Sequence, residues 1–354
     1  MMSGNSVGDI LIDQVDRRLL NILQSEFPLS ERPFREIAER LDTSETEVIE
    51  RITRLKDERI IRQISAIFDT QALGYKSSLV AAKIDPSEVD NAASIINQHP
   101  GVSHNYLRNN KYNLWFTIAV PPKSRFGLEG TIGILRDKSG AEEMRLLPTL
   151  RLFKIGVRFD MSGEEDLNSR SSDGIYGRRP EGNPCAELTD KEISAIRVLQ
   201  KDIPVTPSPF DLPAGEAGVD TPTLLDYARG FMADGRMRRF AAVLHHRRAG
   251  FRANAMGVWA VPEADIEETG RRMAAFSAVS HCYQRPSYPD WPYNIFTMVH
   301  GRTVEDCEEI LARMSDETGI RERSALYSAK EYKKTRVVYF TPEIDDWEKL
   351  QFRQ

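Results

Sequence analysis

The sequence has few of the residues that build disulfide frameworks, and it has no long apolar run. Its 354 residues include three cysteines, without CxxC spacing: Cys185, Cys282 and Cys307. This count excludes a disulfide scaffold and predicts a reduced, cytoplasmic protein. No apolar run approaches the roughly 18 residues that span a bilayer, so we expect no membrane partner. The opening MMSGNSVGDILIDQVDRR has no secretory signal pattern.

Cationic charge is also limited. The sequence has 48 Lys and Arg against 53 Asp and Glu, a net charge of −5. This balance excludes a generally basic nucleic-acid-binding surface, although a local basic patch remains possible. The motifs GxxxxGK[ST], HExxH and GxSxG are absent, so phosphate-loop enzymes, zinc hydrolases and serine hydrolases lose their usual sequence support.

The chain contains a tandem duplication. ILQSEFPLSERPF, which ends at Phe34, resembles VLQKDIPVTPSPF, which ends at Phe210, and the offset, 210 minus 34, is 176 residues. Further along, VSHNYLR (102–108) matches VSHCYQR (279–285). Several collinear matches indicate two homologous halves. We expect the halves to pair as a pseudo-dimer within the chain, and a homodimer is also possible.

Each half begins with a helical pattern. In the first half, an amphipathic helix starts near Asp13, PFREIAERL predicts a second helix, and SETEVIERITRLKDERI predicts a third, with Ser44 and Glu47 as a candidate capping box. The extended stretch IIRQISAIF follows. Three short helices and an extended segment are typical of a winged helix-turn-helix.

The remainder of each half alternates strand and helix patterns in the order β-α-β-β-α-β, which is the ferredoxin-like arrangement. We expect the last strands at TLRLFKIGVRF (149–159) and KKTRVVYF (333–340). The fold class is therefore α+β, a tandem repeat of winged helix-turn-helix and ferredoxin-like βαββαβ domains. The predicted parts are a helix-turn-helix at 1–64, a ferredoxin-like domain at 65–160, a linker at 161–184, a degenerate helix-turn-helix at 185–240, a second ferredoxin-like domain at 241–342 and a tail at 343–354.

DNA binding is disfavoured by the composition of both helix-turn-helix segments. The first recognition helix would present carboxylates where DNA phosphates lie, and its later Arg51, Arg54 and Lys56 could equally form a solvated face. The second segment, DLPAGEAGVDTPTLLDYARG, carries prolines and glycines that disfavour a regular recognition helix. We therefore expect no DNA partner.

Two histidines occupy the same place in the repeats, each followed by Tyr at +2 and Arg at +4. Side chains two residues apart share one face of a strand, so we expect two equivalent groups: His281 with Tyr283 and Arg285, and His104 with Tyr106 and Arg108. An imidazole and a fixed cation suit acid/base work on an anionic substrate. Alternatively, these faces pack against each other, with each Arg paired to a carboxylate.

The strongest difference between the halves is the run His245, His246, Arg247 and Arg248, where the first half has DTQA. These side chains could bind carboxylates or a haem iron, although a solvated basic turn is the ordinary alternative. Arg252 and its counterpart Lys76 add possible cations. The asymmetry suggests that the second half keeps the working site.

The insertion PSYPDWPY (286–293) places Tyr288, Trp291 and Tyr293 between prolines. These aromatic rings could form a stiff lid over a flat macrocycle. A packed surface loop is the alternative.

The order of domains resembles the Lrp/AsnC family of regulators. A closer resemblance is carried by FDTQALGYKSSLVAAKI with VSHNYLRNNKYNLWFTI, and by FAAVLHHRRAGFRANAMGVWAVP with VSHCYQRPSYPDWPYNIFTMVHG. These motifs resemble the two partner subunits of siroheme decarboxylase, here fused into one chain. The resemblance covers nearly all of the chain outside the linker.

This resemblance implies a carbon-carbon lyase that converts siroheme to 12,18-didecarboxysiroheme by removing two acetate carboxyl groups, in haem d1 or alternative haem biosynthesis. For this reaction we hypothesise that His281, together with His245 or His246, transfers protons or contacts the substrate iron. The residues that we expect to bind the substrate carboxylates or the macrocycle are Arg247, Arg248, Arg252, Tyr283, Arg285, Tyr288, Trp291, Tyr293, His104, Tyr106, Arg108 and Lys76. No cofactor beyond the siroheme iron and no separate metal site is expected.

Two other functions compete with the enzyme. A tetrapyrrole-responsive Lrp/AsnC-type regulator would bind DNA and leave siroheme unchanged, and a carrier would hold a tetrapyrrole without converting it. The sequence leaves open which arm reacts first, whether one or both halves are active, and whether the product goes to haem or haem d1.

Overall fold

The computed structural model describes residues 12–155, 187–244 and 253–351. They belong to two compact units, which are described separately. The first unit combines residues 1–73 with 185–246, and the second combines 74–184 with 247–354. Among the residues described, no helix is long and apolar enough to cross a membrane.

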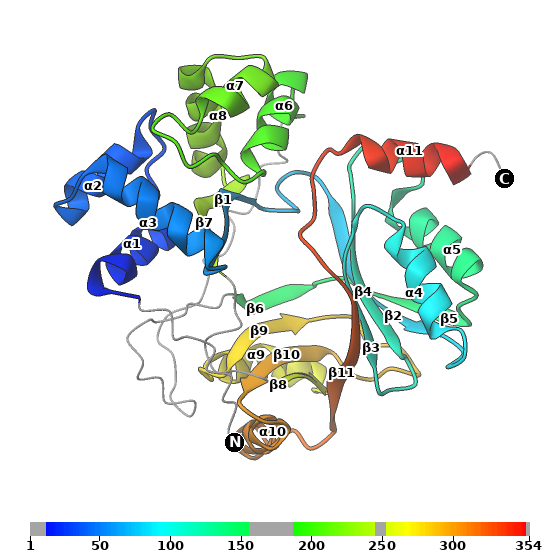
Figure 1. Cartoon of the computed structure of the whole chain (residues 1–354). Helices are drawn as coiled ribbons and strands as arrows, with labels where there is room; N and C mark the ends of the chain where they lie inside the picture. Colours follow the sequence, from blue (N-terminus) through cyan, green and yellow to red (C-terminus); the bar gives the residue numbers. More distant parts are fainter. Residues whose placement is uncertain (1–11, 156–186, 245–252, 352–354) are drawn as a thin grey trace, which may run out of the picture. The chain divides into compact units, whose positions relative to one another are not determined.

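The first unit contains the two helical segments and a two-stranded sheet (Figure 1). Its elements are α1 (Gln14–Ser25), α2 (Pro33–Leu41), α3 (Glu45–Asp57), β1 (Ile61–Phe68), α6 (Asp190–Leu199), α7 (Asp211–Ala217), α8 (Thr221–Ala233) and β7 (Met237–Leu244). β1 pairs with β7 in antiparallel fashion, with Ile64 opposite Ala242. The boundaries expected at 64/65 and 240/241 therefore fall inside strands. Each strand finds its partner in the other repeat, so both strands stay with the helices.

Local capping explains where the helices of this unit begin. Asp13 caps α1 and forms a capping box with Asp16. Ser44 caps α3 by accepting a hydrogen bond from the Glu47 N–H at 3.2 Å. The Glu47 carboxylate contacts Thr43 and Arg51. An oxygen acceptor at an N-cap satisfies an N–H that has no partner within the helix.

The expectation that the second repeat lacks a regular recognition helix is wrong. α8 is a helix of 13 residues at that place. Pro222 lies in its first turn, where a proline removes no helical hydrogen bond. Gly218 ends α7 with a φ of 71°, and the Asp220 side chain caps α8. Gly218 and Pro222 therefore mark helix ends, Pro213 and Gly215 lie within the short α7, and the middle of α8 is uninterrupted.

The second unit contains both ferredoxin-like halves, joined in one nine-stranded sheet. Its strands are β2 (Lys76–Lys83), β3 (Val102–Arg108), β4 (Leu114–Val120), β5 (Glu143–Leu147), β6 (Arg151–Ile155), β8 (Ala253–Trp259), β9 (Val279–Gln284), β10 (Ile295–Gly301) and β11 (Arg323–Lys334). Its helices are α4 (Val89–Asn97), α5 (Gly127–Ser139), η2 (Glu263–Asp265), α9 (Ile266–Ala274), α10 (Val304–Thr318) and α11 (Pro342–Gln351).

The two halves exchange parts of their last strands. The strand order is β5-β2-β4-β3-β11-β8-β10-β9-β6. β11 pairs first with β8 of its own half and then with β3 of the other half, whereas β5 pairs with β2 and β6 with β9. Only residues 148–150 separate β5 from β6, so the two edges of the sheet are consecutive parts of the chain. The predicted pairing of the halves within the chain is confirmed.

The last strands differ from their predicted positions. Only the short β6 lies within the strand expected at 149–159, β5 comes before it, and β11 ends at Lys334, near the start of the strand expected at 333–340. Pairing with two different neighbours decides where these strands lie. The expected tail at 343–354 contains α11, whose Trp347 packs edge-on against His99 with ring centroids 4.5 Å apart.

Three apolar clusters stabilise the second unit. α4 and α5 pack on one face of β2 and β4, and α9 and α10 pack on one face of β8 and β10 (Figure 1). The third cluster takes residues from both halves, among them Trp115, Leu147, Met256 and Leu326. The face that is not covered by helices is therefore shared between the halves, and it carries the candidate site.

Candidate active site

The two repeated His-Tyr-Arg groups lie on β3 and β9, and each group shares one face of its strand. The His281 and Tyr283 rings lie 5.9 Å apart, and the Arg285 guanidinium lies 4.8 Å from the Tyr283 ring centroid. In the first half, the His104 and Tyr106 rings lie 6.2 Å apart, and Arg108 lies 5.7 Å from the Tyr106 ring. The predicted shared face is confirmed in both repeats.

Both arginines are held by the other half of the sheet. Arg108 Nη1 donates to the carbonyl of Leu326 on β11 at 2.7 Å, and Arg285 Nη1 donates to the carbonyl of Leu147 on β5. The Nε of each arginine is buried without a hydrogen-bond partner. Burial lowers the pKa of each guanidinium to about 10. Both side chains therefore stay cationic at neutral pH although they are poorly solvated.

Neither arginine forms an ion pair with a carboxylate among the residues that the structure describes. The alternative of arginines paired to carboxylates is therefore wrong for this part of the chain. A buried cation without a counter-ion is costly unless a ligand compensates it. The arrangement favours binding of an anionic group, for which Arg offers parallel N–H donors.

A serine hydroxyl orients each histidine. Ser280 Oγ lies 2.8 Å from His281 Nδ1, and Ser103 Oγ lies 3.1 Å from His104 Nδ1. The strand register is irregular at both places, and such bulges re-aim side chains next to functional sites. At His281, the hydrogen bond occupies Nδ1 and leaves Nε2 for a proton transfer or for an iron atom. Residue prediction missed these serines, although the repeated VSH motif contained them.

The environment of His281 keeps its imidazole neutral. Burial is the main reason that its pKa falls to about 4. Electrostatic repulsion from four basic side chains acts in the same direction: His300, Arg285, His104 and Lys154. The influence of His104 on His281 shows that the two repeated groups lie near each other in the second unit.

The two groups differ in their neighbours on the last strands. Glu331 of β11 is opposite Tyr106, and burial together with this carboxylate raises the pKa of Tyr106 to about 12. The same place opposite Tyr283 is held by Leu152 of β6, which is 40% exposed. The second-half group therefore has an apolar side chain at the place where its counterpart has a carboxylate.

The insertion at 286–293 forms the loop between β9 and β10, and one of its rings lies in the core. Trp291 is 1% exposed and packs against Trp115, Tyr112 and Tyr293 at centroid distances of 5.3, 5.7 and 5.0 Å. Contrary to the lid hypothesis, this ring is enclosed by other aromatic rings. Its position supports the packed-loop alternative for Trp291.

The other two rings of this loop are half-buried. Tyr288 donates from its hydroxyl to the Leu146 carbonyl at 2.6 Å, and burial raises the pKa of Tyr288 and of Tyr293. Asp290 accepts a hydrogen bond from the Tyr112 hydroxyl and lies 3.3 Å from Arg145. These contacts attach the loop of one half to β5 of the other.

Several predicted residues lie apart from the group or outside the structure. Lys76 is exposed at the start of β2. Five of the predicted site residues lie outside the described ranges: His245, His246, Arg247, Arg248 and Arg252. Within those ranges, no group of three or more His, Cys, Asp or Glu side chains could hold a metal ion. Cys282 and Cys307 are buried, free thiols.

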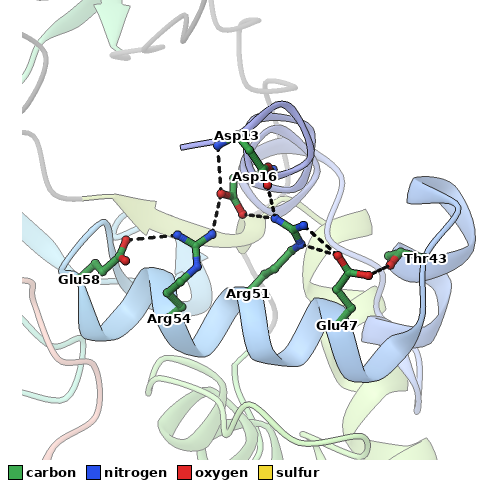
Figure 2. A network of polar contacts seen from close by, with 7 residues as sticks. All are labelled: Asp13, Asp16, Thr43, Glu47, Arg51, Arg54 and Glu58. Carbon is green, nitrogen blue, oxygen red and sulfur yellow. Dashed lines mark hydrogen bonds and ion pairs between the residues drawn. The ribbon is translucent and has the colours of Figure 1, made fainter. Parts of the chain in front are cut away.

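The cations of the first recognition helix are engaged within the domain. Arg51 contacts Asp13, Asp16 and Glu47, and Arg54 contacts Asp16 at 2.6 Å (Figure 2). Asp16 is completely buried. Lys56 pairs with Asp202 at 2.7 Å. The three cations that could have met DNA phosphates thus neutralise carboxylates of their own unit.

Comparisons with known proteins agree with this geometry. The family model described as a siroheme decarboxylase NirDL-like HTH domain matches residues 16–62, and the AsnC-like ligand binding domain matches residues 72–154 and again 248–333. The siroheme decarboxylase of Hydrogenobacter thermophilus is 36% identical over 330 residues, which are 93% of this chain and 96% of the relative.

Two solved structures are similar over 96% of this chain and 99% of their own. The crystal structure of the siroheme decarboxylase NirDL gives a TM-score of 0.79 at 32% identity, and the same enzyme in complex with an iron-uroporphyrin III analogue gives 0.78 at 31%. The duplication, the exchanged strands and the end-to-end similarity have one explanation: the chain belongs to the siroheme decarboxylase family, as a fused, two-repeat decarboxylase.

Proposed function

We propose that the chain converts siroheme to 12,18-didecarboxysiroheme by removing two acetate carboxyl groups. The observation that carries this proposal is Arg285, whose buried Nε lacks a hydrogen-bond partner and which pairs with no carboxylate among the described residues, on the same face as the neutral His281. A substrate with several carboxylates supplies the missing negative charge, and a decarboxylation requires one proton donor at carbon.

The proposed chemistry divides the roles between cation and acid. Arg285 and Arg108 bind carboxylates that are retained and so hold the macrocycle in place. The bond between the reacting carboxyl group and its methylene carbon breaks, and carbon dioxide leaves. The electron pair passes into the conjugated ring, and His281 Nε2 then protonates the methylene carbon, which becomes a methyl group. Each acetate arm thus loses one molecule of carbon dioxide and takes up one proton.

The remaining expectations become part of the same proposal. His245 or His246 contacts the iron or transfers protons, and Arg247, Arg248, Arg252 and Lys76 add cations for carboxylates. Tyr106, Tyr283, Tyr288 and Tyr293 border the macrocycle. The iron of siroheme is the substrate's own, and no further cofactor takes part, because the macrocycle accepts the electron pair. The protein acts in the cytoplasm, without DNA.

The test is anaerobic incubation of the purified full chain with siroheme, followed by mass spectrometry of the tetrapyrrole. We expect a product that has lost two molecules of carbon dioxide. Binding of siroheme without a change in its mass would contradict the proposed decarboxylase activity and favour a carrier.

A second measurement assigns the acid. His281→Gln keeps a polar side chain of similar volume but has no imidazole to exchange protons. We expect its turnover to fall about 100-fold, within the range typical of a general acid, while siroheme titration still shows binding. Unchanged turnover would contradict the role of His281.

A further inference from the structure

A chain of hydrogen bonds leads from His281 toward the surface of the second unit. Ser280 Oγ lies 2.8 Å from His281 Nδ1 and 2.6 Å from His300 Nε2. His300 Nδ1 lies 2.5 Å from Asn254 Oδ1. Ser280 is 5% exposed, His300 is partly exposed and Asn254 is exposed. Two imidazoles are thus joined by one hydroxyl, with the inner imidazole beside the proposed reaction site.

We infer that His300 is a positioning residue that delivers protons to His281 through Ser280. This inference rests on the proposed decarboxylation, and it adds the route by which each consumed proton is replaced.

The donors and acceptors of the chain fit such a transfer. When His300 carries two protons, its Nδ1–H donates to Asn254 and its Nε2–H donates to Ser280, whose hydroxyl then donates to Nδ1 of His281. His281 in this tautomer carries its proton on Nε2, toward the substrate. As that proton moves to the methylene carbon, Nδ1 takes the hydroxyl proton and Ser280 takes one from His300. One proton leaves His300 and one C–H bond forms.

The need for such a supply follows from the burial of His281. After burial, the main causes of its low pKa are the basic side chains of His300, Arg285, His104 and Lys154. A ring in this environment is neutral at neutral pH. A neutral imidazole that gives up a proton must receive another on its second nitrogen in the same event, and Ser280 is bonded to that nitrogen.

The first half lacks the outer member of the chain. The backbone N–H of His300 donates to the carbonyl of Ala278, three residues before His281. The backbone N–H of Ala119 donates to the carbonyl of Gly101, three residues before His104, so Ala119 is the counterpart of His300. Ser103 contacts Thr117 Oγ1 at 2.7 Å instead of a second imidazole. In the second half, Ser280 thus joins the repeated histidine to another imidazole, whereas Ser103 contacts His104 and the Thr117 hydroxyl. We assign proton delivery to this half.

The experiment compares His300→Gln and His300→Ala with the unaltered full chain, using anaerobic turnover of siroheme and titration of its binding. Gln offers Ser280 a hydrogen-bond partner but cannot relay a proton, so a purely structural role would survive this change. We expect both variants to lower kcat about 10-fold or more, with siroheme binding unchanged. Added imidazole should restore part of the turnover of His300→Ala.

Two further variants complete the design. Ser280→Ala breaks the bridge and should lower kcat as His300→Gln does, whereas Ser103→Ala removes the matching hydroxyl from the first half and should cost less. Arg302→Ala, an exposed change beside the same strand, controls for altered folding and should turn over normally.

The outcomes separate the two proposals. If the unaltered chain does not decarboxylate siroheme, the proposed function fails and the inference fails with it. If the unaltered chain is active and His300→Gln keeps its full kcat, the relay alone is overturned. Loss of binding in both His300 variants, without rescue by imidazole, would also overturn the relay, because it would show a structural role.

Discussion

Arg108 donates a hydrogen bond across the repeats to the carbonyl of Leu326, 2.7 Å away. Arg285 makes the reciprocal contact to Leu147. In a ferredoxin-like half alone, neither carbonyl would be available, because each belongs to the other half: Leu326 lies on β11 and Leu147 lies on β5. The pairing of the two halves in one sheet therefore completes both arginine sites, and it gives a physical reason for fusing two such domains.

Replacing Arg285 should separate stability from binding. Arg285→Met puts a long apolar side chain in place of the arginine, and it removes a poorly solvated charge that has no counter-ion among the described residues. We expect the melting temperature to stay the same or rise, while siroheme affinity falls about 10-fold or more through the loss of a charged hydrogen-bond donor. Calorimetry and siroheme titration measure the two effects. Arg136→Met on the exposed face of α5 is the control, and a lower melting temperature specific to Arg285→Met would contradict this prediction.

The neighbour of Tyr283 should control the affinity of the second half for anions. Leu152→Glu gives this half the carboxylate that Glu331 supplies beside Tyr106 in the first half. Because the new charge repels substrate carboxylates, we expect siroheme to bind about 10-fold more weakly, and added salt should reduce the difference. Leu152→Gln is the uncharged control. Equal loss in both variants would show that shape, and not charge, matters at this position.

Two buried histidines predict acid sensitivity of the fold. Burial lowers the pKa of His99 to about 3 and that of His281 to about 4, against about 6.5 in an unfolded chain. As pH falls from about 6.5 toward 4, the unfolded state therefore binds protons that the folded state does not bind, and the free energy of unfolding decreases. Each histidine contributes a slope of roughly 1.4 kcal/mol per pH unit in this window.

Urea unfolding at several pH values tests this prediction through His99→Gln. The variant should show a shallower loss of stability between about pH 6.5 and pH 4, whatever its stability at neutral pH. An unchanged slope would show that His99 titrates normally in the folded protein.

The helix-turn-helix should not bind DNA with sequence specificity. Arg51 and Arg54 of the first recognition helix pair with the buried Asp16 and its neighbours (Figure 2), so these two cations are not available to displace counter-ions from phosphates. Fluorescence anisotropy with random and genomic duplexes should show only weak binding that disappears at physiological salt. Saturable binding to a defined sequence at that salt would contradict the prediction and support a regulator.

Much of the fold followed from local patterns in the sequence. The helix over residues 33–41 was predicted to the residue, and the His-Tyr-Arg faces followed from the alternation of side chains along a strand. Caps and periodicity act over a few residues, so they can be recognised without knowing the fold. α8 has the same signals, but Gly218 and Pro222 were interpreted as helix breakers, whereas they mark the end of α7 and the start of α8.

The sequence by itself determined the duplication, the element types and the paired histidines, because each depends on neighbouring residues or on direct comparison of the two repeats. The tertiary structure decided which strands exchange, where the arginines find their carbonyls, that Trp291 is enclosed, and that Ser280 joins His281 to His300. These contacts depend on strand order and register between segments far apart in the chain. No local pattern encodes that register, since it results from packing both halves into one sheet.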